Sequence, residues 1–206
     1  MKLFIAPRAP NPRRVQMFIA EKGIAGIEEV PVDLNGGAHR TDEFRKLSPH
    51  ARVPVLQLDD GRGLSETRAI CAYLEGLHPE PNLMGRDVTE RAFIEMADRQ
   101  AEWYWMATIA GAVRHTHPGL ATLEVPQFPE FGQVQARRVR ESAARFDAML
   151  AQQPYWAGDR FTIADITAFT SIEFARGLLK FRAGEEGFAH LQAWRDRVAE
   201  RPSAQV

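Results

Sequence analysis

The sequence predicts an α/β domain over residues 1–78, a linker over residues 79–87 and an all-helical domain over residues 88–206. Three observations support this division. Short apolar runs alternate with helical spacing through the first part of the chain. Two prolines within residues 78–82 then interrupt both patterns. After them, apolar residues recur only at intervals of three and four, which predicts helices alone.

The α/β part is expected to begin with a strand and a helix. Residues 2–6 (KLFIA) form the predicted strand. Pro12 suits the first turn of a helix, and Asn11 stands where an N-cap would stand. Apolar spacing continues to Gly23, which ends the helix. Residues 13–14, both arginine, are expected on its solvated face.

Three more strands and a closing helix complete a βαβ-ββα order, with a short extra helix between its two halves. Residues 27–32 alternate apolar and polar side chains, as in a strand, and residues 41–47 fit a short helix. Residues 53–58 are the third strand, and residues 59–63 form a turn into a short fourth strand. A helix follows over residues 67–77. The side chains expected to face inward on it are Ile70, Tyr73, Leu74 and Leu77.

The second part is expected to contain four helices. Residues 88–114 form one long helix, and residues 134–150 a second one after a proline-rich loop. Residues 162–165 (TIAD) have the Ser/Thr-x-x-acid shape of a capping box and open a third helix. Residues 188–198 form the last helix. The inward residues expected on the long helix are Phe93, Ile94, Ala97, Ala101 and Tyr104.

Composition excludes several classes of function. Lys and Arg number 26 against 27 Asp and Glu, so nothing resembles a nucleic-acid footprint. The single cysteine, Cys71, excludes an internal disulfide and a Cys-rich metal site, and residues 115–117 (HTH) lack a third metal ligand. Residues 1–6 are too short for a signal peptide, and the apolar run 103–113 is too short to span a membrane. We therefore expect a soluble cytoplasmic protein with no metal and no membrane contact.

The centre of the chain predicts a small-ligand site. Val53-Pro54 enters a buried strand, and a cis bond there would leave the backbone groups of Val53 free. Glu66 and Thr67 stand at the start of the next helix. A Glu, free backbone groups and a helix N-terminus together suit a ligand with its own amine and carboxylates.

Four motifs resemble those of the soluble glutathione transferases. Residues 47–56 (LSPHARVPVL) resemble N-P-x-G-x-V-P-x-L, with the cis proline at Pro54. Residues 64–70 (LSETRAI) resemble L-x-E-S-x-A-I, residues 161–166 resemble F-S-x-A-D, and residues 38–44 resemble H-x-x-x-x-F. The resemblance covers nearly the whole chain. It implies a thioredoxin-like N-terminal domain and an all-helical C-terminal domain.

The resemblance also implies a glutathione site. In such proteins the backbone at the position of Val53 pairs with the cysteinyl part of glutathione. The positions of Glu66 and Thr67 hold its γ-glutamyl end, and those of His39 and Arg52 lie near its glycine carboxylate. Ser48 replaces the family's Asn, Ala51 its Gly and Thr67 its Ser. None of these departures removes a needed group.

The catalytic position departs further from the family pattern. Ala9 stands where a serine is common, and this loop contains no cysteine either, which argues against the thiol-transfer and quinone-reducing branches. Residues 6–15 resemble the T-P-N-G-x-K of a bacterial branch that lacks the serine, with Asn11 on its Asn and Arg14 on its Lys. Asn11 is thus the candidate to contact the sulfur. A plain helix cap is the alternative role.

The long helix is implied to line the pocket for a hydrophobic electrophile. Residues 103, 106, 110 and 114 are expected to share one face of it. Met106, Ala110 and Arg114, together with Ala9, are the candidates for this pocket. Plain core packing is expected for Tyr104 and Ala107.

The expected activity is attack of glutathione thiolate on an electrophilic carbon or on a hydroperoxide oxygen. Glutathione would be a co-substrate, and the resemblance implies a homodimer. The alternative is a non-catalytic glutathione-binding or regulatory module of the same fold.

Overall fold

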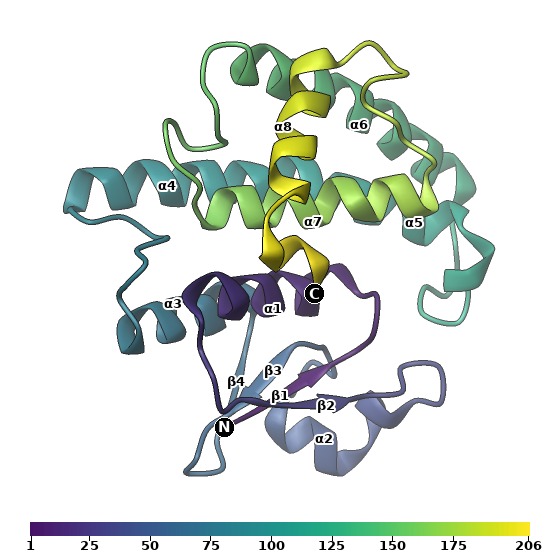
Figure 1. The fold of residues 1–206 in the computed structure, drawn as a ribbon. Coiled ribbons are helices and arrows are strands. Elements are labelled where there is room, and N and C mark those ends of the chain that lie inside the picture. Colours follow the sequence, from purple (N-terminus) through teal and green to yellow (C-terminus); the bar gives the residue numbers. More distant parts are fainter. The chain divides into compact units, whose positions relative to one another are not determined.

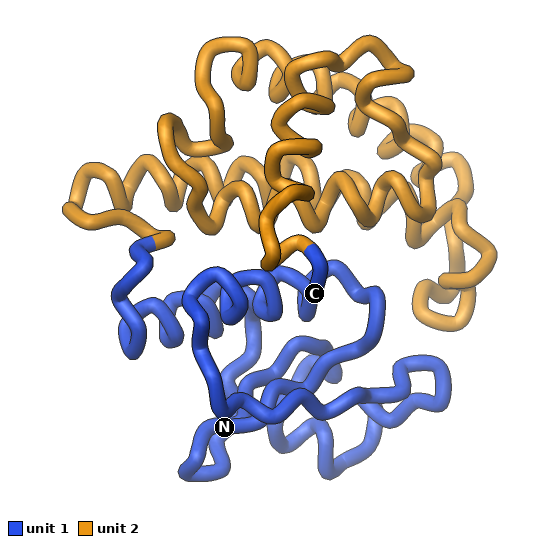
Figure 2. Tube along the Cα trace, in the orientation of Figure 1, with its two compact units in different colours: residues 1–82, 205–206 blue, residues 83–204 orange.

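The computed structural model describes residues 1–206 and divides into two compact units (Figure 1). The first contains residues 1–82 with residues 205–206, and the second contains residues 83–204 (Figure 2). The division thus falls inside the predicted linker, residues 79–87. The domain boundaries proposed from the sequence, at residues 78 and 88, stay a prediction.

The first unit contains a four-stranded mixed sheet. Its strands are β1 (Lys2–Ile5), β2 (Glu28–Pro31), β3 (Val55–Gln57) and β4 (Gly63–Ser65), in the order β2-β1-β3-β4. β1 runs parallel to β2 and antiparallel to β3, and β3 runs antiparallel to β4. The predicted βαβ-ββα order is confirmed, and the Val53-Pro54 peptide bond is cis.

Helices cover both faces of this sheet. Helices α1 (Pro10–Lys22) and α3 (Thr67–Leu77) lie on one face, and the short α2 (Asp42–Leu47) lies on the other (Figure 1). Phe44 of α2 packs against Val32 and Val55. On α3 the buried stripe is narrower than expected, because Tyr73 and Leu77 are exposed while Ile70 and Leu74 are buried.

Helix α1 begins earlier than the sequence predicted. Its N-cap is Ala9, which contributes no side-chain hydrogen bond, and Pro10 occupies the first turn. Asn11 therefore lies inside the helix, and its prediction as an N-cap is wrong. The cause is Pro10. Its fixed φ and missing N–H suit the first helical position, and Pro12 suits that position equally well. The predicted end is confirmed, with Gly23 at a left-handed φ of 61°.

A buried lysine at the end of α1 contacts both α3 and the residues that follow α3. The side chain of Lys22 is fully buried, and its Nζ lies 2.5 Å from Glu75 Oε2. Nζ also donates to the carbonyl oxygens of His78 at 2.7 Å and Pro81 at 2.9 Å. The ammonium group thus has three acceptors, which offset the cost of burying its charge.

The second unit is all-helical, as predicted. Its elements are α4 (Val88–Gln100), η2 (Ala101–Met106), α5 (Ala107–Thr116), η3 (Pro118–Leu120), α6 (Pro129–Leu150), α7 (Ile163–Leu178) and α8 (Ala189–Ala199). The terminal η4 (Pro202–Gln205) begins in this unit, and its last residue is assigned to the first. Helix α6 starts at Pro129 rather than at residue 134, again with proline in its first turn. None of the helices combines the length and the apolar character that crossing a membrane requires.

The predicted long helix contains a π-helical segment. Over η2 the hydrogen bonds widen, and Ala107 N–H donates to the carbonyl of Glu102, five residues back. The wider turn shifts the helical phase. As a result Trp103 is 65% exposed while Met106 is 6% exposed, so the expected shared face of residues 103 and 106 is wrong. Tyr104 and Ala107 are also exposed, so they are not core residues in this unit.

Asp165 fixes the start of α7. Its Oδ2 accepts from the backbone N–H of Thr162 at 2.9 Å, and its Oδ1 accepts from the N–H of Trp156 at 2.8 Å and from Nε1 of Trp194 at 2.9 Å. Burial raises the pKa of the carboxyl to about 6 despite these donors. The predicted cap is confirmed, and it also connects two buried tryptophans.

Candidate functional site

The candidate site in the first unit is built from three loops and two helix starts. The residues proposed for it come from the start of α1, the 3₁₀ turn η1 (Ala38–Arg40), the loop before β3 and the start of α3. The predicted site residues within this unit are Ala9, Asn11, His39, Arg52, Val53, Glu66 and Thr67.

The loop before β3 is closed by a serine. The buried Ser48 hydroxyl donates to the carbonyl oxygen of Arg52 at 2.9 Å and accepts from the N–H of Arg52 at 3.0 Å. Ala51, between them, has a left-handed φ of 53°. The loop leads directly to Val53, which is half-buried, and leaves the side chain of Arg52 exposed. A polar clasp therefore sets the path of the backbone at Arg52 and Val53.

The start of α3 presents a strained glutamate. Glu66 is the N-cap residue with φ 69° and ψ 116°, and its side chain makes no capping hydrogen bond. Positive φ is rare for a residue with a Cβ and is concentrated at functional sites. The exposed carboxylate of Glu66 has no ion pair, whereas Thr67 beside it is buried. A carboxylate thus stands next to the free N–H groups of a helix start.

His39 is a buried neutral imidazole with one unused nitrogen. The residue is 7% exposed, and its Nε2 accepts from Nε of Arg40 at 3.3 Å. Burial and then the charges of Arg40 and Arg52 lower its pKa below the ordinary 6.5. Nδ1 is buried without a hydrogen-bond partner. Because Nε2 accepts, Nδ1 carries the proton and is a donor without an acceptor.

The start of α1 places Asn11 next to a buried arginine. Asn11 is exposed, and its Oδ1 accepts from Nη1 of Arg14 at 3.4 Å. Arg14 itself is 2% exposed, so the expectation that it lies on a solvated face is wrong. Ala9 is half-buried, and its carbonyl accepts from the N–H of Arg13 at 3.3 Å.

The residues predicted for the electrophile pocket are only partly brought together. Ala110 and Arg114 lie one turn apart in α5, and Met106 is buried in η2. Ala9 belongs to the other compact unit. Arg114 Nη1 lies 3.1 Å from Glu124 Oε2, so its charge is already paired.

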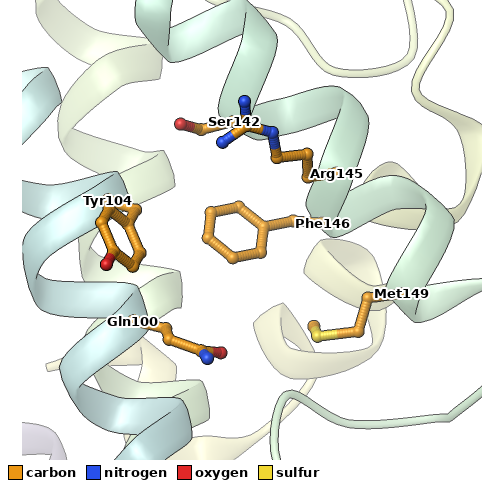
Figure 3. A pocket seen from close by; sticks show the side chains of 6 residues that line it. All are labelled: Gln100, Tyr104, Ser142, Arg145, Phe146 and Met149. Carbon is orange, nitrogen blue, oxygen red and sulfur yellow. The ribbon is translucent and has the colours of Figure 1, made fainter.

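Two hollows in the second unit were not predicted from the sequence. One, of about 300 Å³, lies between α4–η2 and α6, with the ring of Phe146 between Gln100 and Tyr104 on one side and Met149 on the other (Figure 3). The other, of about 530 Å³, is lined by His115, Phe128, Glu130 and Phe131. Neither is lined by Met106, Ala110 or Arg114. Regular helical spacing could not indicate the first hollow, because the π segment moves Tyr104 out of phase.

The structure contains no group of three His, Cys, Asp or Glu side chains arranged to hold a metal ion.

A thioredoxin-like unit followed by an all-helical unit defines a known class of protein, and comparisons identify it. The glutathione S-transferase N-terminal domain matches residues 3–82, and the glutathione S-transferase C-terminal domain matches residues 125–202. The chain is 35% identical to glutathione S-transferase 2 of Saccharomyces cerevisiae, over 98% of this chain and 87% of the relative. It is 31% identical to glutathione S-transferase GstA of Escherichia coli O157:H7, over 100% and 96%. The chain therefore belongs to the glutathione S-transferase family.

Solved structures agree with this assignment. A glutathione S-transferase domain-containing protein of Marinobacter aquaeolei VT8 has a TM-score of 0.93 at 41% identity, over 98% of this chain and 99% of that one. Gtt2 of Saccharomyces cerevisiae also has a TM-score of 0.93, at 34% identity, over 100% and 99%.

Proposed function

We propose that this protein is a glutathione transferase in which the thiolate of bound glutathione attacks a hydrophobic electrophile. Glu66 is the observation that carries this proposal. It holds an uncommon backbone conformation, and its carboxylate neither caps α3 nor forms an ion pair. An ammonium group of a ligand satisfies such a carboxylate, and the adjacent N–H groups of α3 can donate to a carboxylate of the same ligand. The γ-glutamyl end of glutathione carries both groups.

The other end of glutathione is assigned to His39 and Arg52. The unpartnered Nδ1 of His39 is a donor, and the side chain of Arg52 is exposed. Both groups suit the glycine carboxylate. The backbone of Val53, held by the Ser48 clasp, is proposed to pair with the cysteinyl part, and Thr67 with the γ-glutamyl carboxylate.

Asn11 is proposed to stabilise the sulfur, as in a bacterial branch without the catalytic serine. A thiol with a pKa of about 8.5 is only about 3% thiolate at neutral pH. Lowering that pKa by two units requires about 2.7 kcal/mol. An amide N–H bond and the positive end of α1 supply much of this, because both favour a negative charge.

The second substrate is proposed to contact Ala9, Met106, Ala110 and Arg114. The apolar character of the first three favours a hydrophobic electrophile. The same thiolate can also attack the oxygen of an organic hydroperoxide, which would add a peroxidase activity.

A homodimer is proposed from the apolar surfaces that each unit leaves uncovered. In the second unit Phe93 and Met96 of α4 and Tyr104 of η2 are exposed. In the first unit Tyr73 and Leu77 of α3 are exposed one turn apart. Large apolar side chains gathered in this way are typical of surfaces that a partner covers.

A non-catalytic module of the same fold is the second candidate, favoured by the methyl group of Ala9 where a hydroxyl is common. Calorimetric titration with glutathione and conjugation of an aryl halide separate the two. We expect binding and turnover, weaker binding in Glu66→Gln, and unchanged binding in the control Glu43→Gln, which alters an exposed glutamate of α2. Binding without conjugation or peroxide reduction would support the module. Absence of glutathione binding would contradict the whole site assignment.

A further inference from the structure

Arg14 and Asn11 lie one turn apart on α1, and the contact between them has a direction. Nη1 of Arg14 donates to Oδ1 of Asn11 over 3.4 Å. Residues three apart on a helix are neighbours on its surface, so this contact needs no change in the backbone. Arg14 is 2% exposed, whereas Asn11 is exposed to solvent. A buried cation thus supports a polar side chain at the surface of the site.

The direction of this contact matters because an asparagine amide has two unlike ends. Its oxygen accepts hydrogen bonds, and its NH₂ group donates them. A thiolate accepts, so only the NH₂ group stabilises it, whereas the oxygen would repel it. A guanidinium carries donors and no acceptor. Arg14 can therefore face only the oxygen of Asn11, and that orientation leaves the NH₂ group for another partner.

The N-terminus of α1 also favours an anion near Asn11. The first turn of a helix carries a partial positive charge, and Asn11 is the second residue of α1. This suits a negative charge placed next to the amide.

We propose that Arg14 is a positioning residue that fixes the amide of Asn11 with its NH₂ group toward the sulfur of bound glutathione. This inference rests on the proposed function, in which Asn11 contacts the sulfur. Arg14 acts through Asn11 and does not itself touch the thiolate. Without Arg14 the side-chain amide of Asn11 can flip and exchange the positions of its oxygen and its NH₂ group. The thiolate then lacks its hydrogen-bond donor for part of the time.

The test is a double-mutant cycle on the apparent pKa of the bound glutathione thiol. That pKa is measured from the pH dependence of thiolate absorbance in Arg14→Met, Asn11→Ala and the double variant. We expect Arg14→Met to raise the pKa by roughly one unit in the wild-type background. In the Asn11→Ala background the same change should raise it clearly less. Arg13→Met is the matched control, since it removes the positive charge of the neighbouring arginine on the same helix.

Equal shifts in both backgrounds would overturn the proposal, because Arg14 would then act by charge alone or through the fold. An unshifted pKa in Arg14→Met would overturn it as well. If Asn11→Ala leaves the thiol pKa unchanged, the proposed role of Asn11 fails instead. A crystal structure of the wild-type protein with glutathione gives a second check that needs no variant. The proposal requires Oδ1 of Asn11 toward Arg14 and Nδ2 toward the sulfur, and the reverse orientation would contradict it.

Discussion

The hydroxyl group of Ser48 pairs with both backbone polar groups of Arg52. It donates to the carbonyl oxygen and accepts from the N–H, at 2.9 and 3.0 Å. One buried side chain thus closes a loop of five residues and sets the backbone that leads to Val53. The family commonly has Asn at this position, and Ser retains one donor and one acceptor.

Removal of this clasp should weaken both the fold and glutathione binding. In Ser48→Ala the two backbone groups of Arg52 lose their partners, which should cost about 1–3 kcal/mol of unfolding free energy. Unfolding in urea, with and without saturating glutathione, measures both effects. Glutathione should stabilise the variant less than the wild type, because its Kd is higher. Equal stabilisation would show that the clasp does not position the binding loop.

A substitution in the same loop should have the opposite effect on stability. Ala51 has a φ of 53°, where an L-residue with a Cβ is strained by about 1–2 kcal/mol. Glycine removes this strain but gives the unfolded chain more freedom, so Ala51→Gly should raise the unfolding free energy by roughly 0.5–1 kcal/mol. Ala25→Gly, at an exposed alanine with negative φ, is the control and should not stabilise. A less stable Ala51→Gly variant would contradict the assignment of strain.

Lys22 should be among the costliest polar residues to replace. Lys22→Met leaves Glu75 and the carbonyl groups of His78 and Pro81 without their buried donor. We expect a loss of about 3–5 kcal/mol in unfolding free energy, measured in urea. Lys46→Met, at an exposed lysine of α2, should change it by no more than about 0.5 kcal/mol. Similar losses in both variants would show that the three contacts of Lys22 contribute little.

His39 should couple glutathione binding to proton uptake. Burial and neighbouring cations hold its pKa below 6.5 in the free protein, so the imidazole is neutral at pH 7. A bound carboxylate favours the imidazolium and raises that pKa. Binding therefore takes up a proton at His39, which opposes the proton that the glutathione thiol releases. The contribution of His39 to affinity should rise as the pH falls through its pKa in the complex, until it levels off below its pKa in the free protein.

Calorimetry in two buffers with different ionisation enthalpies measures the net number of protons exchanged on binding. His39→Gln should release more protons than the wild type, whereas His50→Gln, which changes an exposed histidine near the same loop, should match the wild type. An unchanged number in His39→Gln would assign the proton to another group.

Local chemistry explains which elements could be predicted from the sequence. Pro54, Gly23 and the Thr162–Asp165 cap each restrict the backbone by themselves, so their structures followed directly. The start of α1 could not be predicted in this way, because Pro10 and Pro12 are equally suited to a first turn. For the same reason the prediction of Asn11 as an N-cap is wrong, since the helix begins one residue before it.

Burial in the candidate site was harder to predict, because it depends on residues distant in sequence. Arg14 follows another arginine and suggests a solvated face, yet tertiary packing buries it. The strain at Glu66 also has no sequence signal, since glutamate rarely adopts positive φ. The family motifs indicated which residues to examine, whereas the unused Nδ1 of His39 required the structure.

The π segment at Ala101–Met106 lets this helix hold one extra residue without changing which way its two ends face. In an α-helix each residue turns the chain by about 100°, and a π turn holds one residue more than an α turn. Deletion of a single residue from the segment would restore regular α-helix, because each kind of turn completes one rotation. Phe93 and Met96 would then keep their direction relative to α5, whereas a deletion between Met96 and the segment would rotate them by about 100°. Alignments that place a gap within these six residues therefore relate helices with the same exposed faces.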